Sequence, residues 1–292
     1  MRVTENMRAA QVLRDMSGLR KRHAKAANAA TSGLLISRPS DDPTAAARLQ
    51  RVQRSVETGK SMNRALSLGR SDLELSEASL AEAGMLMQRA KEVALLAANG
   101  STNADTRASA AEEIIGIRSA LLGIANTKGV RGYLFAGSQT NAPAFDAAFG
   151  YQGDNYVHSI RSGSTSVVTV SSSGLNAFTA AGGTDIFQDL DDLATSMLAN
   201  NQGGIQISLT ALDVGHEQIV LERARTGVNM TRVDQAETIL TNSKFLLEAQ
   251  KTDIGSIDPA ESITELKSLQ NSIERTIGVS AQMLQMDAFS LL

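Results

Sequence analysis

The fold is set by a long stretch without proline, in which residues 66–94 read LSLGRSD LELSEAS LAEAGML MQRAKEV A. An apolar or small residue recurs at every seventh position along it. The full series is Val52, Gly59, Leu66, Leu73, Leu80, Met87 and Ala94. A repeat of seven keeps one face of an α-helix against a partner helix, as in coiled coils. The pattern predicts a helix from Thr44 to Ala98, roughly 80 Å long at about 1.5 Å per residue.

A second repeat of the same kind lies in the C-terminal half of the chain. Its members are Leu212, Ile219, Thr226, Val233, Leu240, Leu247 and Ile254. They predict another long helix, from about Gln206 to Ile254. Two matching repeats in one chain indicate an antiparallel helix pair.

Both long helices are bounded by residues that start or stop helices. A further helix is predicted from about Thr4 to Ser32, and Gly33 follows it, where a helix-ending glycine belongs. Asp42 can accept hydrogen bonds from free backbone N–H groups, and Pro43 suits the first helical position. Asp258 and Pro259 repeat this device near the C-terminus. We expect these five residues to be hinges between the long helices and two terminal arms.

The terminal arms carry weak apolar seams and opposite charges. Residues 1–38 hold eight Lys/Arg against two Asp/Glu, whereas residues 258–292 hold five acids and two bases. Such arms suit assembly with further copies of the chain, since an isolated arm buries too little apolar area to offset its ordering entropy. The predicted assembly interface consists of Val12, Met16, Leu19, Leu266, Leu269, Ile273, Ile277 and Met283.

The middle of the chain changes character. Eight of the ten aromatic residues in the whole chain lie in the segment from Tyr133 to Phe187. Residues 156–161 alternate like a strand, and Val167–Val170 are all β-branched. The predicted fold is therefore mainly α: an elongated rod of long antiparallel coiled-coil helices with a small β-rich inserted domain. Its expected parts are arms 1–40 with 257–292, a long-helix bundle 41–132 with 186–256, and an outer insert 133–185.

Composition argues against several other classes of protein. Cysteine is absent, which excludes disulfides, thiolate metal sites and cysteine nucleophiles. No run approaches the ~18 apolar residues of a membrane span, and the first residues lack the apolar core of a cleavable signal peptide.

The residues that could carry chemistry do not form a recognisable site. His23, His158 and His216 follow no metal-ligand spacing, and Asp41–Asp42 fit a helix cap better than a catalytic pair. The basic cluster at residues 20–25 has no accompanying aromatic residues of the kind that bind nucleic acid. We expect no enzyme activity, cofactor, metal, nucleic-acid or membrane partner. An enzyme within the insert and a receptor-like helical hairpin remain alternatives.

Three stretches resemble a known family. They are MRVT at residues 1–4, GLLISRPSDDP at residues 33–43 and GYLFAGS at residues 132–138. The chain resembles the flagellin family, and within it the proteins that join the flagellar hook to the filament. The resemblance covers both ends and the long helices, but not residues 145–185.

The resemblance implies a location and partners. It implies export by the flagellar type III apparatus with an uncleaved N-terminal signal, with the help of an export chaperone, to an extracellular site on the bacterial flagellum. There the chain would form a ring with itself, between hook-associated protein 1 and the first layer of flagellin, through its terminal arms. The alternative is a minor flagellin that forms the filament itself.

Overall fold

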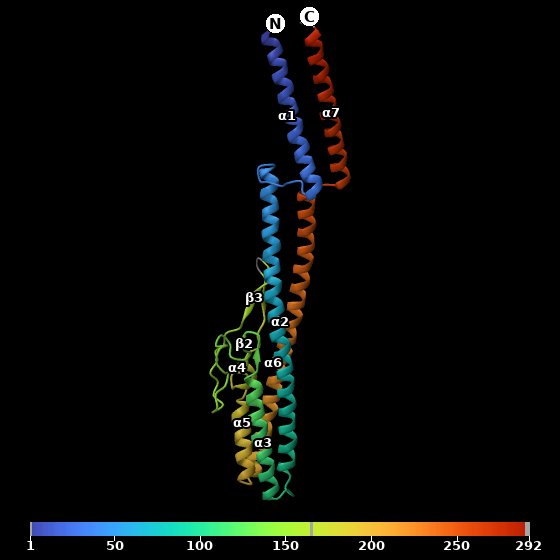
Figure 1. Cartoon of the computed structure of the whole chain (residues 1–292). Helices are drawn as coiled ribbons and strands as arrows, with labels where there is room; N and C mark the ends of the chain where they lie inside the picture. The colour runs from blue at the N-terminus through green and yellow to red at the C-terminus, as the bar shows by residue number, and fades with distance from the viewer. Residues whose placement is uncertain (1, 164–165, 290–292) are drawn as a thin grey trace. The chain divides into compact units, whose positions relative to one another are not determined.

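The computed structural model describes the backbone of residues 2–163 and 166–289, and the side chains of residues 7, 10–163 and 166–282. The elements, labelled in Figure 1, are α1 Arg2–Ser32, α2 Pro43–Ala98, α3 Ala104–Ala125, β1 Lys128–Gly129, β2 Gly132–Tyr133, β3 Ser159–Arg161, β4 Val167–Thr169, α4 Gly174–Phe178, α5 Ile186–Leu198, α6 Gln202–Gly255 and α7 Pro259–Phe289. They form two compact units, Met1–Thr58 with Lys244–Leu292 and Gly59–Ser243. The prediction of a mainly helical chain with two long helices is confirmed.

In the unit 59–243, α2 and α6 run antiparallel. Arg70 of α2 pairs with Asp234 of α6 at 3.2 Å, and Glu77 pairs with Arg223 at 2.6 Å. Residue numbers therefore increase along α2 in the direction in which they decrease along α6. Within this unit the two predicted repeats form the buried seam, with at most 1% of each side chain exposed: Leu66, Leu73, Leu80, Met87, Ala94, Leu212, Ile219, Thr226 and Val233.

Helices α3 and α5 complete this unit around an aromatic core. Four phenylalanines from the predicted insert and from the start of α5 pack ring to ring, with centroids 5.0–6.2 Å apart: Phe135, Phe145, Phe178 and Phe187. They share one apolar cluster with seam residues of α2 and α6. The segment 133–185 therefore packs into the same core as the helices.

The strands of that segment are short. Two antiparallel hairpins are present, β1 with β2 and β3 with β4, the second pairing Ser159 with Thr169. The strand predicted over residues 156–161 is confirmed only for its last three residues. The reason is local: the N–H of Tyr156 donates to the side chain of Asp154 at 3.0 Å, and the N–H of His158 donates to the side chain of Ser171 at 2.9 Å, so neither group joins the ladder.

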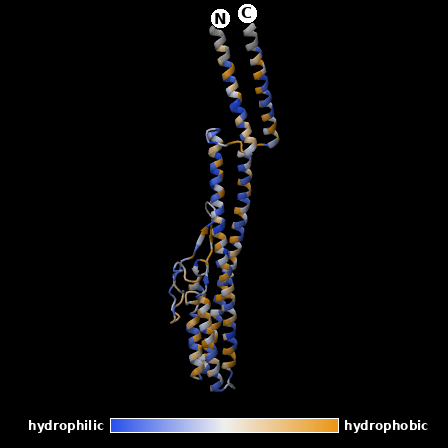
Figure 2. Cartoon of the chain, in the orientation of Figure 1, coloured by the Kyte–Doolittle hydropathy of each residue, from blue (hydrophilic) through white to orange (hydrophobic). Residues whose placement is uncertain are grey.

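The unit formed by residues 1–58 and 244–292 contains α1, α7 and the adjoining ends of α2 and α6. Helices α1 and α7 pack against each other, running in opposite directions (Figure 1). The start of α2 lies along the end of α6, where Val52 is buried and Leu247 and Ile254 are half-buried. Figure 2 shows apolar residues recurring at intervals along these helices, as a packed seam requires.

Candidate assembly site

The two linkers beside the terminal helices are hydrogen-bonded to each other. Gly33 ends α1 with φ +69°, a left-handed conformation that favours glycine. Its carbonyl accepts a bond from the N–H of Ile257 at 3.1 Å, and the N–H of Leu35 donates to the carbonyl of Gly255 at 2.8 Å. Leu34 and Ser256 form an antiparallel bridge between these bonds. This pairing joins the end of α1 to the start of α7, and nothing in the sequence pattern indicated it.

The start of α2 is capped by Asp42. Its Oδ1 accepts hydrogen bonds from the N–H groups of Thr44 and Ala45, both at 2.9 Å. Pro43 is the first residue of the helix and has no N–H that would need a partner. The start of α7 repeats the arrangement, with Asp258 accepting from the N–H of Ala260 at 2.8 Å and Pro259 in first place.

Asp41 organises the linker rather than the helix. The N–H of Arg38 donates to Asp41 Oδ2 at 3.0 Å, and Lys25 of α1 lies 3.6 Å from Asp41 Oδ1. These contacts, the bond from Arg38 first, hold the pKa of Asp41 below its usual value. The linker is therefore shaped by a carboxylate that is ionised at neutral pH.

Six of the eight residues of the predicted assembly interface are half-buried. They are Val12, Met16, Leu19, Leu266, Leu269 and Ile273. They occur on the two helices that pack together, at the heptad spacing of that contact. Ile277 is instead exposed (45%), and the side chain of Met283 lies outside the described ones. The seam within the chain is thus only partly covered.

The outer faces of the same pair also carry large apolar side chains. Leu13 is 66% exposed, Ile263 50% and Val279 53%. Such side chains along both helices leave apolar area that a neighbouring subunit could cover. Of the exposed apolar residues on these two helices, the predicted interface includes only Ile277.

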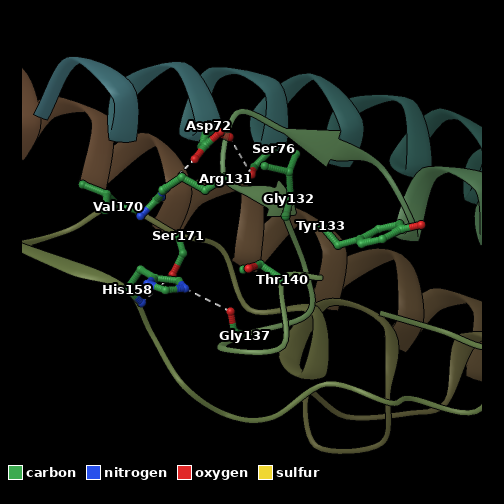
Figure 3. Close-up of a pocket in the computed structure, with 11 residues that line it drawn as sticks. Asp72, Ser76, Arg131, Gly132, Tyr133, Gly137, Thr140, His158, Val170 and Ser171 are labelled. Carbon is green, nitrogen blue, oxygen red and sulfur yellow. Dashed lines mark hydrogen bonds and ion pairs between the residues drawn. The ribbon is translucent and has the colours of Figure 1, made fainter. Parts of the chain in front are cut away.

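The unit 59–243 contains a polar clamp immediately before the GYLFAGS stretch (Figure 3). Asp72 of α2 is buried, and it accepts hydrogen bonds from Arg131 Nε at 2.6 Å and from the N–H of Val130 at 2.8 Å. Arg131 also donates to the carbonyl of Val170 at 2.8 Å. One carboxylate therefore fixes the β1–β2 turn and the segment after β4 onto α2. In the sequence, the only signal for this clamp is the carboxyl of Asp72 next to the apolar seam residue Leu73.

The two glycines of that stretch are required by close approach. Gly132 has φ +116°, and an added Cβ would overlap the carbonyl of Thr140. Gly137 has φ +66°, and its Cβ would overlap Asp154. Between the two glycines, Leu134, Phe135 and Ala136 are buried in the aromatic core. The motif thus turns the chain sharply on both sides of an anchoring segment.

The cavity beside the clamp has a volume of about 20 Å³, close to the space that one water molecule needs. Its lining groups bond mainly to one another, for example His158 Nε2 with the carbonyl of Gly137 at 3.1 Å (Figure 3). His23 and His216 lie half-buried elsewhere. Among the described residues no group of acids and histidines is arranged to hold a metal ion. Nor is any described helix apolar enough over a sufficient length to cross a membrane.

Comparison with known proteins places the chain in a family. It matches the bacterial flagellin N-terminal helical region over residues 3–140 and the bacterial flagellin C-terminal helical region over residues 209–292. These regions take in well over half of the chain, so the chain belongs to the flagellin family. It is a structural, extracellular component of the bacterial flagellum that associates with other flagellar parts, and the predicted family and location are confirmed.

Two relatives bear the same name. Flagellar hook-associated protein 3 of Escherichia coli K12 is 24% identical over 324 residues, covering 100% of this chain and 99% of that protein. The protein so named in Salmonella typhimurium LT2 is 30% identical over 151 residues, covering 51% of this chain. In that second match the chain spans only 48% of the relative.

A solved structure supports the fold. Flagellar hook associated protein-3 from Legionella pneumophila superposes with a TM-score of 0.63 at 14% identity, covering 70% of this chain and 98% of that one. The predicted fold class, a flagellin-like helical chain with a small insert that contains strands, is confirmed.

Proposed function

We propose that this chain is a non-enzymatic subunit that joins the hook of the bacterial flagellum to its filament. Copies of the chain form a ring, with hook-associated protein 1 on one side and flagellin on the other. The proposal is supported by membership of the flagellin family and by the two full- or part-length relatives named as hook-associated protein 3. Export follows the flagellar type III route, assisted by an export chaperone.

The observation that carries the proposal is the incomplete seam between α1 and α7. Six of the predicted interface residues are only half-buried, and further apolar side chains lie on the outer faces of both helices. Two helices of this length gain most of their stability from packing against neighbours rather than from intrinsic propensity. Assembly would supply those neighbours and so complete the burial of the terminal helices.

Deleting the protein tests the junction role directly. Electron microscopy should show hooks without filaments, and immunoblotting should find flagellin released into the medium, because subunits would be exported but not retained. Restoring the protein from a plasmid should return filaments. Normal filaments on the deletion strain would contradict the proposal.

Charged substitutions test the terminal helices as the assembly site. Val12→Asp and Ile273→Asp place a carboxylate in the half-buried seam, and each should abolish filament attachment. Ser17→Asp adds the same charge to α1 at an exposed position and is the matched control. Near-ultraviolet circular dichroism of the tyrosines, all in the unit 59–243, checks that this unit remains folded. A Val12→Asp strain with attached filaments would exclude the seam from assembly.

A minor flagellin is the second candidate, because the matched regions are those of flagellin itself. A protein with that function should polymerise, when purified and concentrated, into long fibres visible by negative-stain microscopy. A junction subunit should instead stop at short oligomers or rings.

A further inference from the structure

The turn between α2 and α3 contains the only Asn–Gly pair of the chain, Asn99–Gly100. Both residues are exposed, and they follow directly after Ala98, the last residue of α2. The backbone nitrogen that follows an asparagine can attack the side-chain amide, because the chain already holds the two groups one residue apart. Glycine hinders this attack least, since it has no Cβ and its backbone turns most freely.

Hydrogen bonds in this turn prepare the groups that would react. Asn99 Oδ1 accepts hydrogen bonds from the N–H of Ser101 at 3.2 Å and from Ser101 Oγ at 3.1 Å. Attack on the amide carbon places negative charge on that oxygen, and the two donors are already in position to stabilise the charge. No described group accepts a hydrogen bond from the N–H of Gly100. The attacking nitrogen is therefore not committed to another contact.

Asparagines followed by serine, another small residue, lie inside helices. Asn242–Ser243 is part of α6, and Asn271–Ser272 is part of α7. In a helix the N–H of the second residue belongs to the hydrogen-bond ladder, so attack by that nitrogen would break the helix. The exposed turn after α2 is thus the place where the reaction meets least resistance.

A buried cation lies beside the same turn. Arg107 of α3 is 6% exposed, and its guanidinium donates to the carbonyls of Ala97 at 2.8 Å and Asn99 at 3.0 Å. It also bonds the side-chain oxygen of Asn200, in the turn between α5 and α6 that lies at the same end of the unit (Figure 1). Buried charges are ordinarily paired with an opposite charge. Among the described residues no carboxylate forms an ion pair with Arg107, whose partners are all neutral oxygens.

We propose that Asn99 is a site of spontaneous deamidation and that the carboxylate produced there pairs with Arg107. The nitrogen of Gly100 bonds to the side-chain carbonyl carbon of Asn99. The bond from that carbon to the amide nitrogen breaks, and the amide takes up the proton and leaves as ammonia. Water then opens the succinimide ring that has formed. Opening at the side-chain carbonyl gives aspartate, and opening at the main-chain carbonyl gives isoaspartate. Water is the only other reactant.

Both products place a carboxylate next to the buried guanidinium. In isoaspartate the free carboxylate is the former main-chain carbonyl group of residue 99, the group to which Arg107 Nη2 donates. In aspartate the charge is on the side chain of the same residue. The end of α2 would by itself disfavour a negative charge. Arg107 binds the last carbonyls of that helix and reverses this preference, so deamidation should stabilise this end of the unit.

Ageing the purified full-length chain in warm, mildly alkaline buffer tests the reaction. Peptide mass spectrometry locates the converted residue, and enzymatic methylation of isoaspartyl groups measures the extent. The signal should grow with time and map to Asn99, while Asn242 stays unchanged. Gly100→Ala should abolish the signal without disturbing the fold, because its Cβ meets only Gln202 Nε2 at 3.7 Å, an ordinary contact. Gly116→Ala, a matched change at another open glycine, should leave the signal as it is.

Thermal unfolding tests the pairing with Arg107. Near-ultraviolet circular dichroism of the tyrosines follows the unit 59–243. The Tm of the natural chain should rise as conversion proceeds, whereas the Tm of Gly100→Ala should stay constant under the same treatment. Asn99→Asp supplies the carboxylate without ageing, and it should melt above the natural chain when both are fresh. The same change made in an Arg107→Gln background should give no gain over Arg107→Gln alone.

Three results would overturn the proposal. If the peptide containing Asn99 keeps its mass after ageing, the reaction does not occur. If Gly100→Ala is converted as fast as the natural chain, the route through the ring is wrong. If conversion and Asn99→Asp leave Tm level or lower it, the carboxylate does not pair with Arg107. These measurements use the isolated chain, so they do not depend on the proposed junction function.

Discussion

Replacing Asp72 by asparagine removes the charge of the buried clamp while keeping the shape of the side chain. The asparagine oxygen could still accept the N–H of Val130, but its amide would face the Arg131 Nε–H donor. Breaking a buried ion pair by removing one partner costs about 3–5 kcal/mol. The side chain of Arg131 is 32% exposed and keeps its bond to Val170, which favours the lower end, about 3 kcal/mol. For a unit of this size that loss lowers Tm by about 6–12 °C.

Thermal unfolding followed by near-ultraviolet circular dichroism measures this effect in the right part of the chain. Tyr133, Tyr151 and Tyr156 are the only tyrosines, tryptophan is absent, and all three lie in the unit 59–243. The matched control is Asp234→Asn, which breaks the exposed pair with Arg70 and should cost less than about 1 kcal/mol.

The reasoning would be refuted if Asp72→Asn destabilised the unit no more than Asp234→Asn does. A double variant adds a second check on the pair. Asp72→Asn combined with Arg131→Met should cost less than the sum of the two single changes, because the second change removes a charge that the first left without its partner. Simple additivity would mean that the two groups do not act as a pair.

Three further changes follow from the same structure. Gly137→Ala should destabilise the unit 59–243 by at least about 1–2 kcal/mol, from the left-handed backbone alone, whereas Gly116→Ala, at an open position on α3, should stabilise it by about 0.5–1 kcal/mol. Thermal melts of the two variants measure the difference, and equal effects would contradict the close-approach argument. Hydrogen bonds, chiefly from Ser138, hold the pKa of Asp154 below its ordinary value, so Asp154 stabilises the fold above about pH 4 and this contribution is lost as pH falls through its folded pKa. Asp154→Asn should flatten that part of the stability–pH curve, and an unchanged curve would exclude the effect. Asp42→Ala should cost about 1 kcal/mol at the start of α2, seen as faster amide hydrogen exchange there, and unchanged exchange would show that the cap is dispensable.

The long helices could be predicted from the sequence because their signal is periodic and local. A residue at every seventh position fixes which face is buried, and Leu66, Leu73 and Leu80 are fully buried as this rule requires. Asp42 and Pro43 mark the start of α2 for a similar reason, since a cap acts within one turn of its own position. The strand predicted over residues 156–161 was longer than the real one because the N–H groups of Tyr156 and His158 donate to side chains, of Asp154 and Ser171, in place of the ladder.

The candidate site was predictable in its location but not in its geometry. The seam residues of the terminal helices follow from heptad spacing, yet spacing alone cannot say whether Val12 meets another chain or α7 of its own chain. The structure brings α1 against α7 and leaves Ile277 outside that contact. Contact with neighbouring subunits therefore stays a prediction for the whole set.

The helical class, the two buried seams and the family follow from the sequence alone, because each depends on spacing within a short window or on a local motif. The packing of the folded chain was needed to show which groups from distant segments meet: Asp72 with Arg131, the linker at Leu34 with Ser256, and the phenylalanines of residues 133–187 with the helical core. Such contacts join segments that lie tens to hundreds of residues apart. Their partners are chosen by how the whole unit packs and by the need to satisfy each buried polar group, neither of which a local pattern records.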